Sequence, residues 1–494
     1  MNIEKRKLQE IHLLGSEKIS QRDSLNNQKV SLRLAKNNLK IKLKRKSIIE
    51  QSKFEYNNVP KEFQIQIYKF ETSYNAIITT LKSNNNILIS YCLNQLVIYF
   101  KYNEPNINEQ KLIIEGHFFE ILLKLGNIFL YNKNENELIL IIWILMNIQI
   151  HNEGNNNYLK ILYSDKFLEF YNICFTQSDS DEIINLIIVL LTYIIKINKE
   201  INLIILKSHV FSSIIYYILN KDPDMEPIEN SLELFISCLN LSFNNELSEL
   251  GQKEINIIND IIIILKKELF TSNNEKLEKL IYEGLYIISK IDNKYKFNEK
   301  MVKEGIPQNI LNINFENYDL LIKGLKLLTN ILTVSDKECK IIIDKNIINY
   351  YNDVLDIYDN DPKIVYIILS GILNICDSKF RNIIKESIIW SRKKIEKYFN
   401  MYDNIKLKFI KIIKYMIING TYNNLLFIYN LNILEYFIYL LASFNLGDKV
   451  TSKIIKLINI YLNQFNDSEK KNIEYYTIFY KFQDLNKLSH KYNK

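Results

Sequence analysis

The chain has 494 residues, of which 47% are hydrophobic and 24% charged, and its formal net charge is +7. This length allows several domains or one elongated array, and the scarcity of glycine (11) and proline (6) disfavours a loop-rich β architecture. The longest apolar run, Ile183 to Ile197, is short for a membrane span and contains Asn185 and Lys196.

The positive charge is concentrated at the start of the chain. The first 50 residues contain 13 Lys and Arg against 5 Asp and Glu, whereas the remaining residues contain 50 against 51. A basic arm on a nearly neutral body indicates an acidic partner for the arm. It disfavours direct nucleic-acid binding by the body.

Residues 1–56 have little sustained apolar periodicity, and we predict a flexible basic tail there. Within it, Val30 to Ile49 reads V-S-L-R-L-A-K-N-N-L-K-I-K-L-K-R-K-S-I-I, which can form an amphipathic basic helix for a membrane, RNA or a partner protein. The alternative is a solvated basic tail without a specific partner.

From residue 62 to residue 488 the apolar spacing is three to four, which predicts amphipathic helices separated by short polar breaks. The same junction recurs: an apolar helix end, a small residue or Asn, then a second apolar helix. It is found at Gly116, at Gly305 with Pro307, and in the stretches Ile342–Tyr351 and Phe427–Leu441. Gly followed by Pro is the clearest form, a helix stop and a helix start.

A second pattern marks one helix per unit. Ile141 to Ile148 reads I-I-W-I-L-M-N-I, with Trp143 and Asn147 four residues apart and therefore on one helix face. Similar pairs follow at intervals of 46, 47, 50, 40, 44 and 45 residues. These are Val189/Tyr193, Ile236/Asn240, Tyr286/Lys290, Lys326/Asn330, Ser370/Asn374 and Tyr415/Asn419.

A period of about 40–47 residues is typical of armadillo or HEAT arrays. We therefore predict an all-α, right-handed armadillo-repeat superhelical solenoid of about nine to ten repeats with a long concave surface.

The Trp143/Asn147 pair allows two interpretations. An indole face can hold the stem and charge of a Lys or Arg, and an amide can pair with a peptide backbone. Alternatively, the pair is a buried Trp and a structural Asn, which is the default for one such pair alone. Recurrence along the chain favours peptide binding.

Chemistry-bearing motifs are absent from the sequence. The five histidines are scattered, no phosphate-binding loop or catalytic triad spacing occurs, and no Cys/His metal spacing exists. We predict neither an enzyme nor a cofactor or metal protein. His117, after Gly116, reads as a turn residue. The polar start is unlike a signal peptide, and the isolated cysteines indicate a soluble protein in a reducing compartment.

These residues together resemble the importin-α (karyopherin-α) family of nuclear import adaptors. The stretch from Val30 is similar to the family's importin-β-binding segment, and Trp143/Asn147 to the first pair of its signal-binding ladder. G-L-K-L-L-T-N-I-L-T-V-S-D, containing Lys326, is similar to the middle repeat, and Phe482 to His490 to the closing segment.

The resemblance implies partners and site residues. Basic nuclear-localisation-signal proteins would bind in the groove, importin-β would bind the tail, an export receptor would recognise the C-terminal repeat, and the protein would occupy cytoplasm and nucleus. The implied cargo-peptide-binding residues are Trp143, Asn147, Ile236, Asn240, Tyr286, Lys326, Asn330, Ser370, Asn374, Tyr415 and Asn419. The implied importin-β-binding residues are Leu32, Arg33, Lys36 and Lys40, with Lys44, Arg45 and Lys46 as the autoinhibitory mimic.

Only one Trp of that ladder is present, since Val189, Ile236 and Ser370 stand where the family has indoles. This leaves open an alternative function, an armadillo-repeat interaction scaffold that no longer serves classical import.

Overall fold

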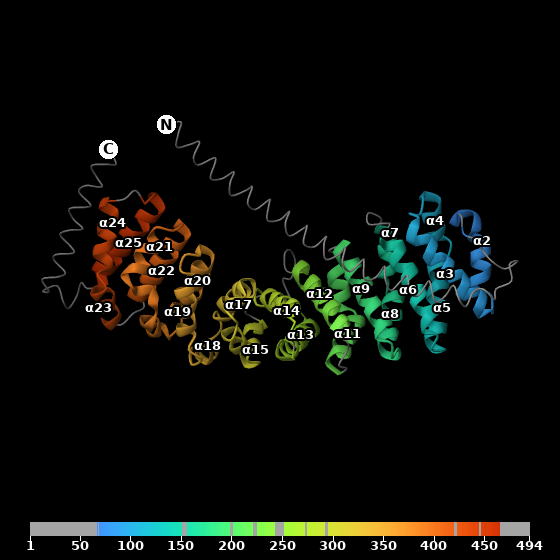
Figure 1. Cartoon of the computed structure of the whole chain (residues 1–494), viewed down its shortest axis with the longest axis horizontal. Helices are drawn as coiled ribbons and strands as arrows, with labels where there is room; N and C mark the ends of the chain where they lie inside the picture. The colour runs from blue at the N-terminus through green and yellow to red at the C-terminus, as the bar shows by residue number, and fades with distance from the viewer. Residues whose placement is uncertain are drawn as a thin grey trace, which may run out of the picture. The chain divides into compact units, whose positions relative to one another are not determined.

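In the computed structural model of the chain, the described residues are 67, 69–150, 156–197, 201–220, 225–242, 251–271, 274–291, 295–418, 422–443 and 446–464. Within these ranges the chain is helical and contains no strand (Figure 1). The predicted tail of residues 1–56, including Lys44–Lys46, and the closing segment 482–490 lie outside them. The chain divides into two compact units, Met1–Phe170 and Tyr171–Lys494, which are described separately.

Unit 1 is built around two helices, α3 and α6, that pack against each other. The buried carboxylate of Glu109, a residue that is 2% exposed, links the first helices of unit 1. It accepts hydrogen bonds from Tyr99 Oη (2.7 Å), Phe70 N (2.9 Å) and Asn106 N (3.1 Å). The helices are α2 (Phe70–Leu81), α3 (Asn86–Tyr102), α4 (Ile107–Glu115), α5 (Phe118–Tyr131), α6 (Glu135–Ile150) and α7 (Asn156–Leu162), followed by α8 (Asp165–Gln177), which crosses into unit 2.

Unit 2 continues the repetition of helices (Figure 1). Its helices are α9 (Asp181–Ile197), α10 (Ile201–Lys207), α11 (His209–Asn220), α12 (Met225–Ser242), α13 (Gln252–Thr271), α14 (Glu275–Ile288), α15 (Phe297–Lys303), α16 (Ile306–Leu311), α17 (Tyr318–Ile331), α18 (Asp336–Ile343), α19 (Ile347–Tyr358), α20 (Pro362–Asp377), α21 (Arg392–Phe399), α22 (Asp403–Ile418), α23 (Tyr422–Asn430), α24 (Ile433–Ser443) and α25 (Asp448–Gln464).

The helices that carry the recurring pairs form the spine of unit 2. Helices α9, α12, α14, α17, α20, α22 and α25 each pack against the next in this series, and we call them the inner helices. Every pair predicted between Val189 and Tyr415 begins on one of them. The predicted period is therefore confirmed as a stack of equivalent helices.

The predicted junctions are confirmed as sharp turns between helices. In each, the residue before the second helix has a left-handed backbone: His117 (φ 62°), Gly305 (φ 81°), Asn346 (φ 63°) and Asn432 (φ 52°). Glycine and asparagine adopt this conformation at low cost. His117 is indeed a turn residue, exposed and paired through Nδ1 with Glu120 at 2.8 Å.

One repeat departs from the others. Between α20 and α21 the chain forms two 3₁₀ helices, η4 (Arg381–Glu386) and η5 (Ile388–Trp390). Trp390, which lies outside the sequence pattern, is 4% exposed, and its Nε1 donates to the carbonyl of Ile384 at 2.6 Å. Its ring packs on Phe409 and Phe427. It fixes the irregular segment to α22 and α23.

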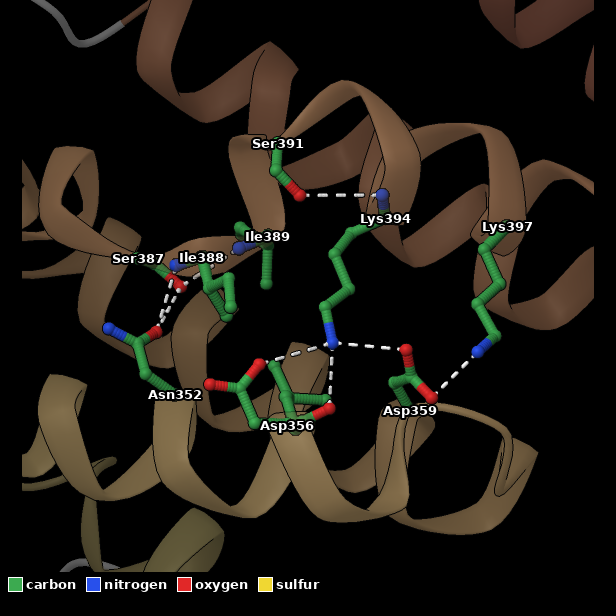
Figure 2. Close-up of polar contacts among 10 residues, drawn as sticks. Asn352, Asp356, Asp359, Ser387, Ile388, Ile389, Ser391, Lys394 and Lys397 are labelled. Atoms are coloured by element: carbon green, nitrogen blue, oxygen red, sulfur yellow. Dashed lines mark hydrogen bonds and ion pairs between the residues drawn. The ribbon is translucent and has the colours of Figure 1, made fainter.

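The helix that follows this segment, α21, carries a buried lysine, Lys394, whose side chain is 8% exposed. Figure 2 shows its Nζ between Asp356 (3.5 Å) and Asp359 (3.1 Å), donating also to the carbonyl of Leu355 at 2.8 Å. Lys397 contacts the other carboxylate oxygen of Asp359 at 2.6 Å. The cluster joins α21 to the end of α19.

Candidate functional site

The inner helices of unit 2 are buried except for one stripe each. Along α14, α17, α20 and α22 the less buried positions recur every three or four residues, as expected for one face of a helix. Most of the predicted cargo-binding residues of unit 2 lie on these stripes and are half-buried. They are Tyr286, Lys326, Asn330, Ser370, Asn374 and Tyr415.

The amides of the stripes connect neighbouring repeats. Asn330 Nδ2 donates to Ser289 Oγ at 2.9 Å, beyond the end of α14, and Asn374 Nδ2 donates to the carbonyl of Thr329 on α17 at 2.7 Å. Thr329 in turn donates through Oγ1 to Leu325 (2.8 Å) on its own helix. Each Asn thus fixes the register of its helix on the preceding one. An amide has two N–H donors and an acceptor, so both retain capacity for a ligand.

Lysines of the protein lie over the tyrosine rings of the stripes. Lys290 Nζ lies 4.2 Å and Lys326 Nζ 5.9 Å from the ring centre of Tyr286. Lys408 Nζ lies 5.1 Å from the ring centre of Tyr366. All three distances fall within the range of cation–π attraction.

A further contact of this type places Lys411 Nζ 5.7 Å from the ring centre of Tyr415. We call Tyr286, Lys290, Lys326, Tyr366, Lys408, Lys411 and Tyr415 the lysine–tyrosine lane. The spacing argument alone missed Tyr366 and Lys408. The signal that could have found them is helical spacing: Tyr366 lies four residues before Ser370, and Lys408 lies seven residues, about two turns, before Tyr415.

Burial and charge both act on the lane. Burial, followed by the neighbouring ammonium of Lys411, lowers the pKa of Lys408 below its ordinary value. Positive charge is therefore crowded at this position, and the charged form would be favoured by an anion.

Trp143 and Asn147 are placed differently, in the interior of unit 1. Trp143 and Asn147 are both 2% exposed, and twelve consecutive residues of α6, Leu138 to Gln149, are buried. Asn147 Nδ2 donates to the carbonyl of Val97 on α3 at 3.3 Å. This placement favours the packing interpretation for the pair, because an indole enclosed by its own protein presents no face to a peptide.

The other predicted site residues are either buried or outside the described part of the chain. Ile236 is 8% exposed on α12. The side chain of Asn240, the whole of Asn419 and the tail residues Leu32 to Lys46 lie outside the described part of the chain. Their predicted roles stay predictions.

The described residues contain no group of three or more His, Cys, Asp or Glu that could hold a metal ion. The cysteines are free and buried, and burial raises the pKa of Cys92 and Cys174 to about 12. Taken singly, no described helix has the length and apolarity of a membrane span; Asn424–Asn430 and Ile433–Ala442 meet that measure only as a pair bent by 52°.

No family model and no curated protein matches the chain. Solved structures do match. An engineered protein shares 15% identity over 83% of this chain and 98% of its own, with a TM-score of 0.54. A structure describing a phosphorylation switch in the interaction between cadherin and β-catenin shares 10% identity over 87% and 81%, with a TM-score of 0.56.

A designed armadillo repeat protein in complex with the peptide (KR)4 matches 52% of this chain and 99% of its own at 14% identity and a TM-score of 0.38. The matches above 0.5, with the stacked inner helices, show that the chain is an all-α armadillo-repeat solenoid.

Proposed function

We propose that the protein is a binding scaffold, not an enzyme, that holds an extended segment of a partner protein along inner helices α14 to α22. One observation carries the proposal: the half-buried Tyr, Asn and Ser side chains at equivalent positions of consecutive helices. Stacked repeats present such positions as a continuous row. Aromatic rings and amides with spare hydrogen-bonding capacity suit an extended backbone and its side chains.

The test is selection of 12-residue peptides from a fully randomised display library on the full chain, followed by affinity measurement with two variants. Ser370→Tyr places a large side chain in the middle of the stripe, and Asp353→Tyr places the same side chain at an exposed position of α19. Selected peptides should bind Ser370→Tyr at least about tenfold more weakly, since the larger side chain sterically excludes the peptide where it passes α20. Equal weakening in both variants, or none in either, overturns the proposal.

A narrower candidate is a nuclear import adaptor shuttling between cytoplasm and nucleus. The sequence from Val30 to Ile49 supports it, through its resemblance to an importin-β-binding segment. Importin-β should then bind a peptide of residues 1–56. The triple change Arg33→Ala, Lys36→Ala and Lys40→Ala should abolish that binding. Failure of the unchanged peptide to bind at physiological salt rejects the adaptor and leaves the scaffold.

A further inference from the structure

The charge of the lysine–tyrosine lane defines what can bind there. A basic peptide would need aromatic faces free for its own Lys or Arg side chains. In this chain the rings of Tyr286, Tyr366 and Tyr415 already have a lysine of the protein over them. A cationic ligand would have to displace these ammonium groups and would be repelled by them.

Three carboxylates on the helices of the lane are engaged by lysines outside it. Glu283 on α14 pairs with Lys323 at 2.9 Å, and Glu275 pairs with Lys279. Asp403, in the first turn of α22, pairs with Lys406 at 2.9 Å. Two turns separate Asp403 from Lys411, about 12 Å along a helix axis, which exceeds the screening length of about 8 Å in physiological salt.

For three of the four lane lysines, namely Lys290, Lys408 and Lys411, no carboxylate of the described residues lies within 4.0 Å of the ammonium group. Lys408 and Lys411 lie three residues apart on α22, and burial followed by the ammonium of Lys411 lowers the pKa of Lys408. The stripe is therefore a row of positive charge with hydrogen-bonding groups between, namely Asn330, Ser370 and Asn374.

We propose that the lysine–tyrosine lane binds an acidic peptide, with carboxylates on the lysines and the peptide backbone on the amides of Asn330 and Asn374. This rests on the proposed scaffold function and adds the partner's chemistry. The chain's own tail is not the occupant, because its first 50 residues contain 13 basic against 5 acidic residues. Like charges oppose that docking.

The separation of the inner helices sets the length of the peptide that can contact all of them. Packed helices lie about 8–10 Å apart and an extended chain advances about 3.3 Å per residue, so about three residues pass each repeat. A peptide of 12 residues spans the four inner helices from α14 to α22. Acidic side chains at every third position would meet successive helices.

The experiment uses the full chain and three 12-residue peptide pools with Glu, Lys or Ser fixed at every third position and the others randomised. The Glu pool should be enriched at least about tenfold over the Lys pool, and its binding should weaken with added salt. The variant Lys326→Ala/Lys408→Ala/Lys411→Ala should bind the selected acidic peptides at least about tenfold more weakly. The control Lys337→Ala/Lys340→Ala/Lys345→Ala removes three lysines from and beside α18 and should bind them as the unchanged protein does.

The outcomes separate the two proposals. Preferential enrichment of the Lys or Ser pool, lost in Ser370→Tyr, leaves the scaffold standing and overturns the acidic ligand. Enrichment of no pool overturns both. Acidic peptides that bind the lane variant and its control equally well also overturn the acidic lane, because their site would lie elsewhere.

Discussion

Lys394 gives the sharpest test of how unit 2 holds its irregular repeat. Replacing it with Met keeps the aliphatic stem but removes the ammonium that contacts Asp359, Asp356 and the carbonyl of Leu355. Removing one partner of a buried ion pair costs about 3–5 kcal/mol. Asp356 is 60% exposed and Asp359 keeps Lys397, so both remain partly satisfied. We expect Lys394→Met to destabilise this region by about 2–3 kcal/mol.

The assay is urea unfolding followed by the fluorescence of Trp390, in a Trp143→Phe background so that only one tryptophan reports. The neighbouring lysine on the same helix, Lys393, is exposed, and Lys393→Met should change the unfolding free energy by less than about 0.5 kcal/mol. Equal effects of the two substitutions would refute the assignment of Lys394 as a buried tie between α19 and α21.

The same cluster predicts a dependence on pH. Burial alone would raise the pKa of Asp359, but hydrogen bonds from Lys397 and Lys394 outweigh it and hold the pKa below its ordinary value of 3.8. A carboxyl whose pKa is lower in the folded state stabilises that state fully above 3.8 and loses this contribution as the pH falls through its folded pKa. Acid should therefore destabilise the unchanged protein more than Lys394→Met between about pH 4 and pH 2.

Three further predictions concern buried side chains. Trp143→Ala should destabilise unit 1 by about 3–5 kcal/mol, measured by thermal unfolding, without weakening the peptides selected on unit 2. Glu109→Gln should cost about 1–2 kcal/mol, seen as faster amide exchange at Phe70 and Asn106, since the amide replaces one accepting oxygen by a donor. The cysteines should react with a thiol reagent at pH 8 only after denaturation, because their thiols are buried and Cys92 and Cys174 have pKa values of about 12.

Much of the fold follows from the sequence because helix period and turn chemistry are local. Spacing of three to four places Ser370 and Asn374 on one helix face, and Gly305 with Pro307 predicts a helix stop and start. The structure confirms this junction and shows a left-handed backbone at Gly305. The 3₁₀ segment before Trp390 was not predicted. It depends on contacts with α22 and α23 that no local pattern encodes.

The site was harder to predict, because its chemistry joins side chains of different repeats. Spacing of four within a helix pairs Lys411 with Tyr415, but the contacts of Lys326 with Tyr286 and of Lys408 with Tyr366 require the stacking of helices. The burial of Trp143 could have been predicted from the local sequence. Ile139 to Ile148 contains one polar residue, and a helix that is apolar all round is buried.

The lane and the tail are best understood together. A ladder that binds basic peptides suits a basic tail as a competing occupant, since both would meet the same rings and amides. Here those rings in unit 2 carry the protein's own lysines, so a tail with more than twice as many basic as acidic residues would be repelled by the surface it would have to occupy. If the lane binds an acidic peptide as proposed, the tail would remain available for the acidic partner that its charge predicts, and the two interactions would be independent rather than competitive. Addition of the 1–56 peptide should accordingly leave the affinity of the lane for a selected acidic peptide unchanged, after correction for direct pairing of the two peptides, whereas displacement by competition for the lane would restore the autoinhibitory role implied for Lys44, Arg45 and Lys46.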